Sequence, residues 1–511
     1  MPIAHTNVHA SSAHDGVHAP SVSKDLRPCT RSHSTTAPGA RHVTPTNPNS
    51  TTPAARAASD GVVLMSAGSV RTWFTKVAPG SSPLGTRSPL FRACASGRYH
   101  HPLMGSAKKT SKRPSKRPAS RPAKKVAKKA TPKAAPAPAT PKLKLLPDLT
   151  PDFKSRLGKL AAAIDARSVS HALITNPLDV AYFTGFLGGD SYLVAGTGGP
   201  VLISDFRYEE ELAPVASLAR IHIRKGGIIG AVADVASQLN VTELGVQAEH
   251  VTLAQSSQLA EALGEGKAIR PLTRLVQPFR LIKDDSEVRL IQNAARIQEA
   301  ALREILPTLA PGQTELDIAS RLEAAMKSRG SPKPGFESIV AARANGSLPH
   351  YRPKMVKAAN NTPLLIDWGA TYKGYHSDMT RVFAFGKWPA KVREIYQIVR
   401  EAHMAAAAAL KPGVSTRDID AIARGHITDA GYGPNFGHGL GHGLGLQGHD
   451  EPSLSHMASP TELAAGMVVT IEPGIYLPNI GGVRLEDDYL ITDTGATNLC
   501  TLPLDIEWAT L

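Results

Sequence analysis

The chain has 511 residues, a formal net charge of +15 and three cysteines. This length predicts two or three domains. So few cysteines exclude a disulfide framework and a thiolate metal site, and they fit a reducing compartment such as the cytoplasm. No apolar run reaches the roughly 18 residues that a membrane span needs, so we expect none.

The net positive charge of the chain comes from residues 1–145. Residues 1–145 contain 24 of the 58 Lys and Arg residues but only 3 of the 43 Asp and Glu residues. The remaining 34 basic and 40 acidic residues give residues 146–511 a net charge of −6. Residues 1–145 are rich in Ser, Thr, Pro, Ala and Lys, with too little apolar surface to offset chain entropy, which predicts a disordered basic tail.

The function of this tail has two interpretations. Residues 105–145 resemble the tails of linker histones in their Lys, Ala and Pro repeats. Such a segment can bind nucleic acid weakly and without sequence preference by displacing counterions from phosphates. It can equally be a solvated linker without a fixed partner. Met104, which opens Met-Gly-Ser-Ala-Lys-Lys, is an alternative start to Met1.

Residues 146–276 alternate between helical and strand patterns. An amphipathic pattern predicts a helix at 156–166, and the short apolar runs that follow predict strands. This alternation predicts an α/β layer with a mixed sheet. Residues 282–305 then predict a long helix with Asp285 and Ser286 near its N-cap.

Two aspartates lie in apolar, β-branched contexts on either side of a turn. Asp367 ends Leu-Leu-Ile-Asp, Asp378 begins Asp-Met-Thr-Arg-Val, and Gly374 lies between them, which predicts a β-hairpin. A turn centred on Tyr372 and Lys373 would place the two aspartates directly opposite each other, with Cβ atoms about 5 Å apart.

Glu472 and Glu486 form a second such pair around a turn centred on Asn479. Opposed carboxylates on a half-buried sheet repel each other unless a cation lies between them. A single carboxylate in a strand is more often an exposed surface residue, and a histidine in a glycine-rich run is more often a loop residue. Two facing acid pairs with His442 between them in the chain instead predict an oxygen-rich site for two divalent metal ions.

The order Asp, Asp, His, Glu, Glu and the motifs around these residues resemble the catalytic domain of the pita-bread metallopeptidases. These enzymes include methionine aminopeptidase, aminopeptidase P and prolidase, and the resemblance covers residues 278–511. The motifs that carry it are Leu348-Pro349-His350-Tyr351, Gly441-His442-Gly443-Leu444-Gly445-Leu446, His449, Glu472-Pro473-Gly474-Ile475-Tyr476 and Val483-Arg484-Leu485-Glu486. Asp450 is a mild departure, since many relatives have Glu there. Creatinase, which shares the fold without the metal ligands, is disfavoured.

The resemblance implies an α/β (α+β) fold with two domains after the tail. Residues 146–276 are similar to the creatinase-type N-terminal domain that precedes the catalytic domain in aminopeptidase P and prolidase, but not in simple methionine aminopeptidases. Residues 277–511 would form the pita-bread catalytic domain. The long disordered basic tail, residues 1–145, would precede both.

The resemblance also implies a set of metal ligands, namely Asp367, Asp378, His442, Glu472 and Glu486. Asp378 and Glu486 would bridge two divalent ions. Asp367 would bind one ion, and His442 with Glu472 would bind the other. Oxygen ligands with one imidazole favour Mn²⁺, with Co²⁺, Fe²⁺ and Zn²⁺ as other candidates.

The implied catalytic residues are His350, His449, Glu472 and Arg484. Glu472 would carry a proton to the leaving nitrogen, while His350 and His449 would bind the peptide and stabilise the oxyanion. Arg484 lies two residues before the last ligand, so it shares a strand face with it and would bind a ligand carboxylate; an ordinary salt bridge is the alternative. The sequence leaves His438 open as a site residue or a loop histidine.

These residues predict an Xaa-Pro aminopeptidase, a metal-dependent exopeptidase for peptides with proline in the second position. A prolidase (Xaa-Pro dipeptidase) is the alternative, and it would also have to hold the substrate's free carboxylate, for which Arg352 is either a pocket or a surface residue. A non-catalytic pita-bread module with a nucleic-acid-binding tail is disfavoured, because such relatives typically lose metal ligands. We also expect a homodimer.

Overall fold

A computed structural model describes residues 143–511 of the chain. The predictions for the basic tail, including its disorder, its binding of nucleic acid and the alternative start at Met104, lie outside these residues. All structural statements below concern the described part of the chain.

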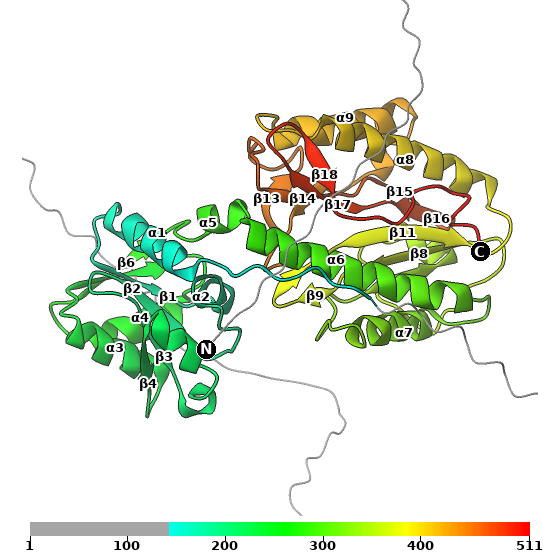
Figure 1. Ribbon diagram of the computed structural model, residues 1–511. Coiled ribbons are helices and arrows are strands. Elements are labelled where there is room, and N and C mark those ends of the chain that lie inside the picture. The colour runs from blue at the N-terminus through cyan, green and yellow to red at the C-terminus, as the bar shows by residue number, and fades with distance from the viewer. Residues whose placement is uncertain (1–142) are drawn as a thin grey trace, which may run out of the picture. The chain divides into compact units, whose positions relative to one another are not determined.

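A six-stranded mixed sheet forms the centre of the N-terminal part of the described residues (Figure 1). Its strand order is β4-β3-β2-β1-β5-β6, and β1 pairs antiparallel with β2 and parallel with β5. The mixed sheet predicted from the sequence is therefore confirmed. The strands are β1 (His171–Ile174), β2 (Tyr192–Gly196), β3 (Val201–Ser204), β4 (Arg220–Ile223), β5 (Glu243–Gln247) and β6 (Ala268–Leu272).

Helices cover both faces of this sheet, because successive residues of a strand point to opposite sides. Ala172 and Ile174 of β1 belong to one apolar cluster with the first two helices, whereas Leu173 belongs to another cluster with the next two. The helices are α1 (Phe153–Asp165), α2 (Pro177–Thr184), α3 (Ile228–Gln238) and α4 (Leu253–Leu263).

Two helices begin beside an aspartate that caps them. The Asp152 carboxylate accepts a hydrogen bond from the first turn of α1, so α1 begins at Phe153, before the predicted start. Asp284 and Glu287 form a capping box at the start of the long helix, so residue 282, which the sequence predicted as helical, lies outside it. The long helix is α6 (Asp285–Ile305), and the short helix α5 (Gln277–Leu281) lies in the linker between β6 and α6.

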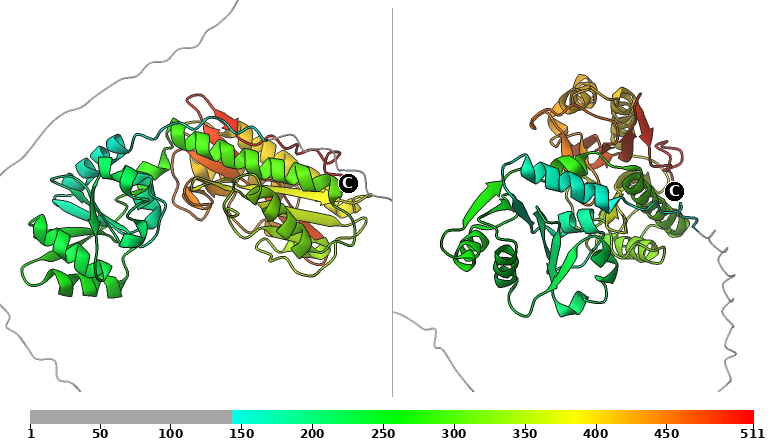
Figure 2. Two further views of the ribbon diagram at one scale, coloured as in Figure 1. Left: turned by 60° about the horizontal axis from the view of Figure 1, so that its bottom comes forward. Right: turned by 60° about the vertical axis from the view of Figure 1, so that its left-hand side comes forward.

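The C-terminal part contains two larger antiparallel sheets with helices packed around them (Figure 2). One sheet has the order β11-β8-β7, and the other has the order β13-β12-β14-β17-β18. A bridge between Thr380 and Glu486 joins them. The helices are α7 (Glu315–Lys327), α8 (Ala390–Ala409) and α9 (Thr416–Asp429).

Several strands of the C-terminal part pair with the next strand in the sequence and form antiparallel hairpins. They are β7 (Ile339–Ala342), β8 (Pro363–Trp368), β9 (Thr371–Tyr372), β10 (Tyr375–His376), β11 (Met379–Ala384), β12 (Gly441–Gly443), β13 (Asp450–Leu454), β14 (Val468–Ile471), β15 (Gly474–Leu477), β16 (Gly481–Arg484), β17 (Asp487–Ile491) and β18 (Ala496–Asn498). The small pairs β9–β10 and β15–β16 are the tips of two hairpins that carry candidate metal ligands at their bases.

The register of the first hairpin differs from the prediction. Thr380 of β11, and not Asp378, lies opposite Asp367 of β8. The turn is centred on Lys373 and Gly374, whose φ angles are 47° and 87°, as a two-residue type I′ turn requires. The predicted direct opposition of the two aspartates is therefore wrong. Asp378 lies two residues before Thr380, so it is the diagonal neighbour of Asp367.

The register of the second hairpin agrees with the prediction. β14 pairs with β17 and β15 pairs with β16 in one continuous register on both sides of the two glutamates. Glu472 and Glu486 therefore lie opposite each other, with the turn centred on Asn479, which has a φ of 65°.

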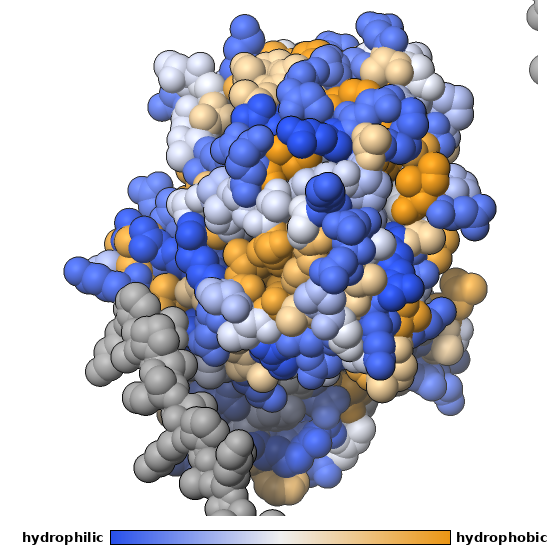
Figure 3. All heavy atoms as spheres, turned by 90° about the vertical axis from the view of Figure 1, so that its right-hand side faces the viewer, coloured by the Kyte–Doolittle hydropathy of each residue, from blue (hydrophilic) through white to orange (hydrophobic). Residues whose placement is uncertain are grey.

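The surface of the described residues is mixed. On the face shown in Figure 3, apolar residues gather in a central patch and in smaller groups, all bordered by hydrophilic residues. Within residues 143–511, no helix is long and apolar enough to cross a membrane.

Candidate functional site

One cavity of about 500 Å³ in the C-terminal part collects the residues that the sequence singled out. These residues come from segments far apart in the chain. Its lining includes His350, Arg352, Asp367, Asp378, His438, His442, His449, Glu472, Arg484 and Glu486.

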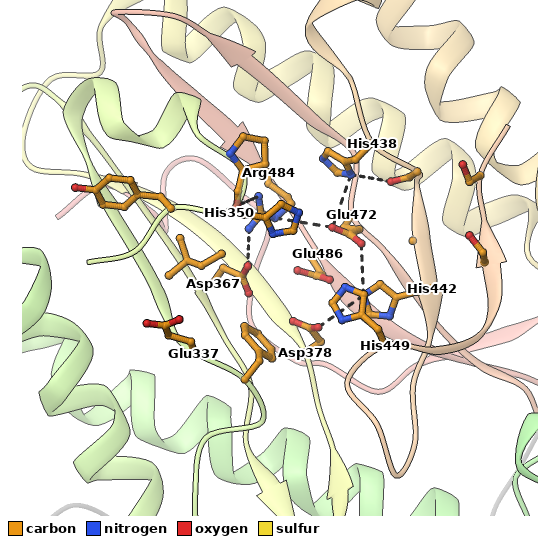
Figure 4. Close-up of a pocket in the computed structure, with 18 of the residues that line it drawn as sticks. Glu337, His350, Asp367, Asp378, His438, His442, His449, Glu472, Arg484 and Glu486 are labelled. Atoms are coloured by element: carbon orange, nitrogen blue, oxygen red, sulfur yellow. Dashed lines mark hydrogen bonds and ion pairs between the residues drawn. The ribbon is translucent and has the colours of Figure 1, made fainter. Parts of the chain in front are cut away.

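Four carboxylates lie at strand ends around the centre of this cavity. Asp367 belongs to β8, and Asp378 directly precedes β11. Glu472 follows β14, and Glu486 directly precedes β17. Figure 4 shows these side chains gathered around a common centre beside His442 of β12. We call the four carboxylates the acid cluster.

The acid cluster has more negative charge than its surroundings balance. Burial, followed by repulsion from Glu486, holds the pKa values of Asp378 and Glu472 well above the usual range. Burial also raises the pKa of Glu486 to about 8. One buried carboxylate oxygen of Asp367 and one of Asp378 have no hydrogen-bond partner among the described residues. Buried acids of this kind need a counter-charge, so the residues present fit bound cations.

His442 presents a free ring nitrogen to the acid cluster. Its Nδ1 lies 3.0 Å from the carbonyl oxygen of Gly443, and because a carbonyl only accepts, Nδ1 carries the proton and Nε2 has a free lone pair. Burial lowers the pKa of His442 to about 3, which keeps the ring neutral. Asp378, His442 and Glu486 each offer a ligand atom within 4.8 Å of the others. This set of donors suits a divalent metal ion.

Arg484 links two members of the acid cluster through direct and indirect contacts. Its Nη2 donates to Asp367 at 2.5 Å, and its Nε donates to the hydroxyl of Thr380 at 3.0 Å. That hydroxyl in turn donates to Glu486 at 2.6 Å. The sequence did not single out Thr380, although its place two residues after Asp378 puts it on the same strand face.

His438 belongs to the site and is held in one tautomer. Its Nδ1 donates to the carbonyl of Gly439 at 2.7 Å, and its Nε2 accepts from the hydroxyl of Tyr476 at 2.8 Å. The same hydroxyl accepts from Arg484 at 2.9 Å. Burial lowers the pKa of His438 to about 4, so its ring is neutral. Tyr476 was missed as a site residue, although it ends the Glu472-Pro-Gly-Ile-Tyr motif.

The two remaining histidines lie at different places around the acid cluster (Figure 4). The ring of His449 stacks on that of His442, with centroids 3.8 Å apart and planes 23° apart. Burial lowers the pKa of His449. His350 lies beside Arg484 and Asp367. The two imidazoles therefore border the cavity at different points around the acid cluster.

Two family profiles match this chain. The profile of metallopeptidase family M24 matches residues 289–493, and that of the creatinase/prolidase N-terminal domain matches residues 156–282. An Xaa-Pro dipeptidase of Pyrococcus furiosus (strain ATCC 43587 / DSM 3638 / JCM 8422 / Vc1) is 35% identical over 356 residues, which cover 68% of this chain and 97% of the relative.

Solved structures of similar proteins extend this likeness to the fold. The Xaa-Pro dipeptidase from Bacillus anthracis has a TM-score of 0.67 at 36% identity, covering 70% of this chain and 99% of that chain. The X-Pro aminopeptidase from Thermotoga maritima MSB8 has a TM-score of 0.63 at 31% identity, covering 68% of this chain and 99% of that chain. Both likenesses therefore span almost the whole length of the similar protein.

Proposed function

Since the chain belongs to metallopeptidase family M24, we propose that it is an Xaa-Pro dipeptidase, which cleaves the bond between a first residue and a following proline. The sequence favoured an aminopeptidase and left the dipeptidase open. Similarity to Xaa-Pro dipeptidases supports the dipeptidase better. The observation that carries the proposal is the buried acid cluster, which lies with His442 in one cavity of about 500 Å³.

The acid cluster and His442 would hold the metal, and we propose two divalent ions, with Mn²⁺ favoured by the oxygen donors. When bound, such ions supply a coordinated water of lowered pKa and polarise the scissile carbonyl. Glu472 carries a proton to the leaving nitrogen. Arg484 holds Asp367, and the hydroxyl of Thr380 holds Glu486, in fixed orientations.

His350 and His449 are proposed to bind the peptide from the two places that they occupy around the acid cluster. Each ring offers an N–H at the rim of a buried site, where a hydrogen bond to a developing oxyanion is strong. The described residues lining the cavity include no lysine, so imidazole and guanidinium groups are its nitrogen donors for a substrate.

Arg352 is the group that we propose for the free carboxylate of a dipeptide. It lines the cavity and pairs with Glu337 at 3.1 Å, and the two side chains are 80% and 65% exposed. An exposed ion pair of this kind is weak, so a substrate carboxylate can replace Glu337. Arg484, the other arginine of the lining, is already bound to Asp367.

An Xaa-Pro aminopeptidase is the second candidate, because the X-Pro aminopeptidase from Thermotoga maritima has the same fold at 31% identity. Manganese-loaded protein assayed on an Xaa-Pro dipeptide and on the matching tripeptide tests the two. A higher kcat/KM for the dipeptide supports our proposal, and cleavage of the tripeptide alone overturns it.

The predicted homodimer stays a prediction, and sedimentation of the purified protein tests it. The non-catalytic alternative loses its basis, because the chain belongs to a peptidase family and keeps all five candidate ligand residues. Binding of nucleic acid was predicted for the tail only, and that segment lies outside the described residues.

A further inference from the structure

A buried arginine from the linker between β6 and α6 binds residues on both sides of His449, close to the start of β13. Arg280 is the penultimate residue of α5, and its Nη2 donates to the carboxylate of Asp450 at 2.8 Å and to the side-chain oxygen of Gln447 at 3.0 Å. Asp450 directly follows His449 in the chain. Arg280 therefore binds the loop on both sides of His449.

The same arginine is anchored to the N-terminal sheet. Its Nη1 donates to Asp179 of α2 at 2.9 Å. The other oxygen of Asp179 accepts from Gln247 of β5 at 2.6 Å. Gln247 accepts in turn from the backbone N–H groups of Thr175 and Asn176, which follow β1. A continuous chain of hydrogen bonds thus connects the core of the N-terminal sheet to the His449 loop.

A second buried cation faces the same carboxylate. Lys283 is buried, and burial lowers its pKa while the nearby charge of Asp450 opposes this change. Together, Arg280, Lys283, Asp179 and Asp450 form what we call the linker cluster. Arg280 makes ion pairs with both carboxylates, so these charges have partners within the protein. Loss of one member would leave a buried charge without a partner.

We propose that Arg280 is a positioning residue that fixes His449 for catalysis through Asp450. The inference rests on the proposed role of His449. The ring of His449 stacks on His442 at 3.8 Å, and its backbone is set by the bond between Asp450 and Arg280. A displacement of about 1 Å at a catalytic group can lower turnover by about 10²-fold. The N-terminal sheet thereby contributes to turnover without touching the substrate.

The test is a double-mutant cycle on kcat in the full-length, manganese-loaded protein. Arg280→Gln is expected to lower kcat by about tenfold or more with an unchanged metal content. In the His449→Ala background the same change is expected to alter kcat by less than about twofold, because coupled residues are not additive. An equal factor in both backgrounds would mean that Arg280 does not act through His449, and the inference would be wrong.

Arg274 provides the matched control. It binds Glu451, the residue after Asp450, at 2.6 Å, but both side chains are largely exposed. Exposed ion pairs contribute little, so Arg274→Gln is expected to leave kcat within about twofold. A loss as large as that of Arg280→Gln would indicate general loosening of the loop and would overturn the inference.

A second variant covers the case in which Arg280→Gln does not fold. Asp179→Asn keeps the bond between Arg280 and Asp450, but it removes the charge that anchors Arg280 to α2 and one of the two oxygens that accept from Arg280 and Gln247. We expect a smaller loss of kcat that again disappears in the His449→Ala background; additive losses overturn the inference. If His449→Ala alone keeps wild-type turnover, the proposed role of His449 fails instead, so the two failures are distinguishable.

Discussion

The acid cluster and the linker cluster are both buried groups of charges, but they differ in balance. In the linker cluster, Arg280 makes direct ion pairs with both carboxylates, and Lys283 is buried near Asp450. The acid cluster has four carboxylates with only one neutral histidine and one arginine beside them, and two of its buried oxygens have no partner among the described residues. An unbalanced cluster is built to bind a cation, whereas a balanced one is built to hold the protein's own parts.

This comparison predicts that a substitution in the acid cluster will lower both the metal content and the turnover of the protein. Glu472→Gln is expected to show the largest effect, because it removes both a metal ligand and the proton carrier. Turnover should fall by about 10²-fold to 10⁴-fold, and metal analysis should show a reduced content. Glu462→Gln changes an acid outside the cavity lining and is the control. Normal turnover of Glu472→Gln would refute its assignment.

The His449→Ala variant is expected to lower turnover without a change in metal binding. We propose that His449 contacts the substrate rather than the metal, so His449→Ala should lower turnover by about 10²-fold, as the loss of one oxyanion donor does. Its metal content should equal that of the wild type. Kinetics beside metal analysis checks both points. Loss of metal from this variant would show that the roles of His442 and His449 are assigned wrongly.

The imbalance of the acid cluster also predicts how pH affects stability without metal. Burial raises the pKa of Glu486 from 4.5 to about 8 in the folded protein, so folding favours its protonated form. This contribution is complete below the unfolded value and is lost as pH rises through about 8. The raised pKa values of Asp378 and Glu472 act in the same direction.

We therefore expect the Tm of chelator-treated protein to fall as pH rises from about 5 to about 8. Metal binding replaces the protons, so manganese-loaded protein should lose much less of its Tm over the same range. Calorimetric scans of both forms check this. A Tm of the chelator-treated form that rises with pH would contradict the raised pKa values.

The ion pair of Arg352 and Glu337 is exposed, unlike the two buried clusters, and a substitution of Arg352 tests whether this residue binds the substrate carboxylate. Arg352→Ala is expected to raise KM for an Xaa-Pro dipeptide by about tenfold, the scale of one charge-assisted hydrogen bond. KM for the Xaa-Pro amide, which has no carboxylate, should stay unchanged. Arg343→Ala, at an arginine outside the cavity lining, is the control. Equal effects on both substrates would show that Arg352 does not bind the carboxylate.

The smallest effect is expected from the basic tail. Neither cluster contains a residue before Asp179, so deletion of residues 1–140 should leave kcat/KM for short peptides within about twofold. Steady-state kinetics of the truncated protein checks this. A folded truncated protein that loses most of its turnover would show that the tail contributes to catalysis.

The sequence predicted those parts of the molecule that depend on local patterns. The opposition of Glu472 and Glu486 followed from a turn whose centre is marked by Asn479. The predicted opposition of Asp367 and Asp378 is wrong, because Lys373 adopts a positive φ angle that its residue type does not predict. A shift of the turn by one residue moves every partner in the hairpin.

The linker cluster was beyond prediction for a different reason. Arg280 and Asp450 are separated by 170 positions in the chain, and no spacing rule tells which of many cations meets which carboxylate. Thr380 and Tyr476 were missed because a hydroxyl in a strand is ordinary until its partners are known. The charge balance around a site can therefore be determined only from the folded structure, whereas the order of the metal ligands can be read from the sequence.

The most direct test of the account is the binding of Mn²⁺ to full-length, chelator-treated protein, measured by titration calorimetry beside the Asp378→Asn variant. We predict about two ions per chain for the wild type and a reduced number for the variant, because the variant lacks a central carboxylate of the acid cluster. Absence of Mn²⁺ binding by the folded wild type, or equal binding by both proteins, would contradict the assignment of the acid cluster as the metal site.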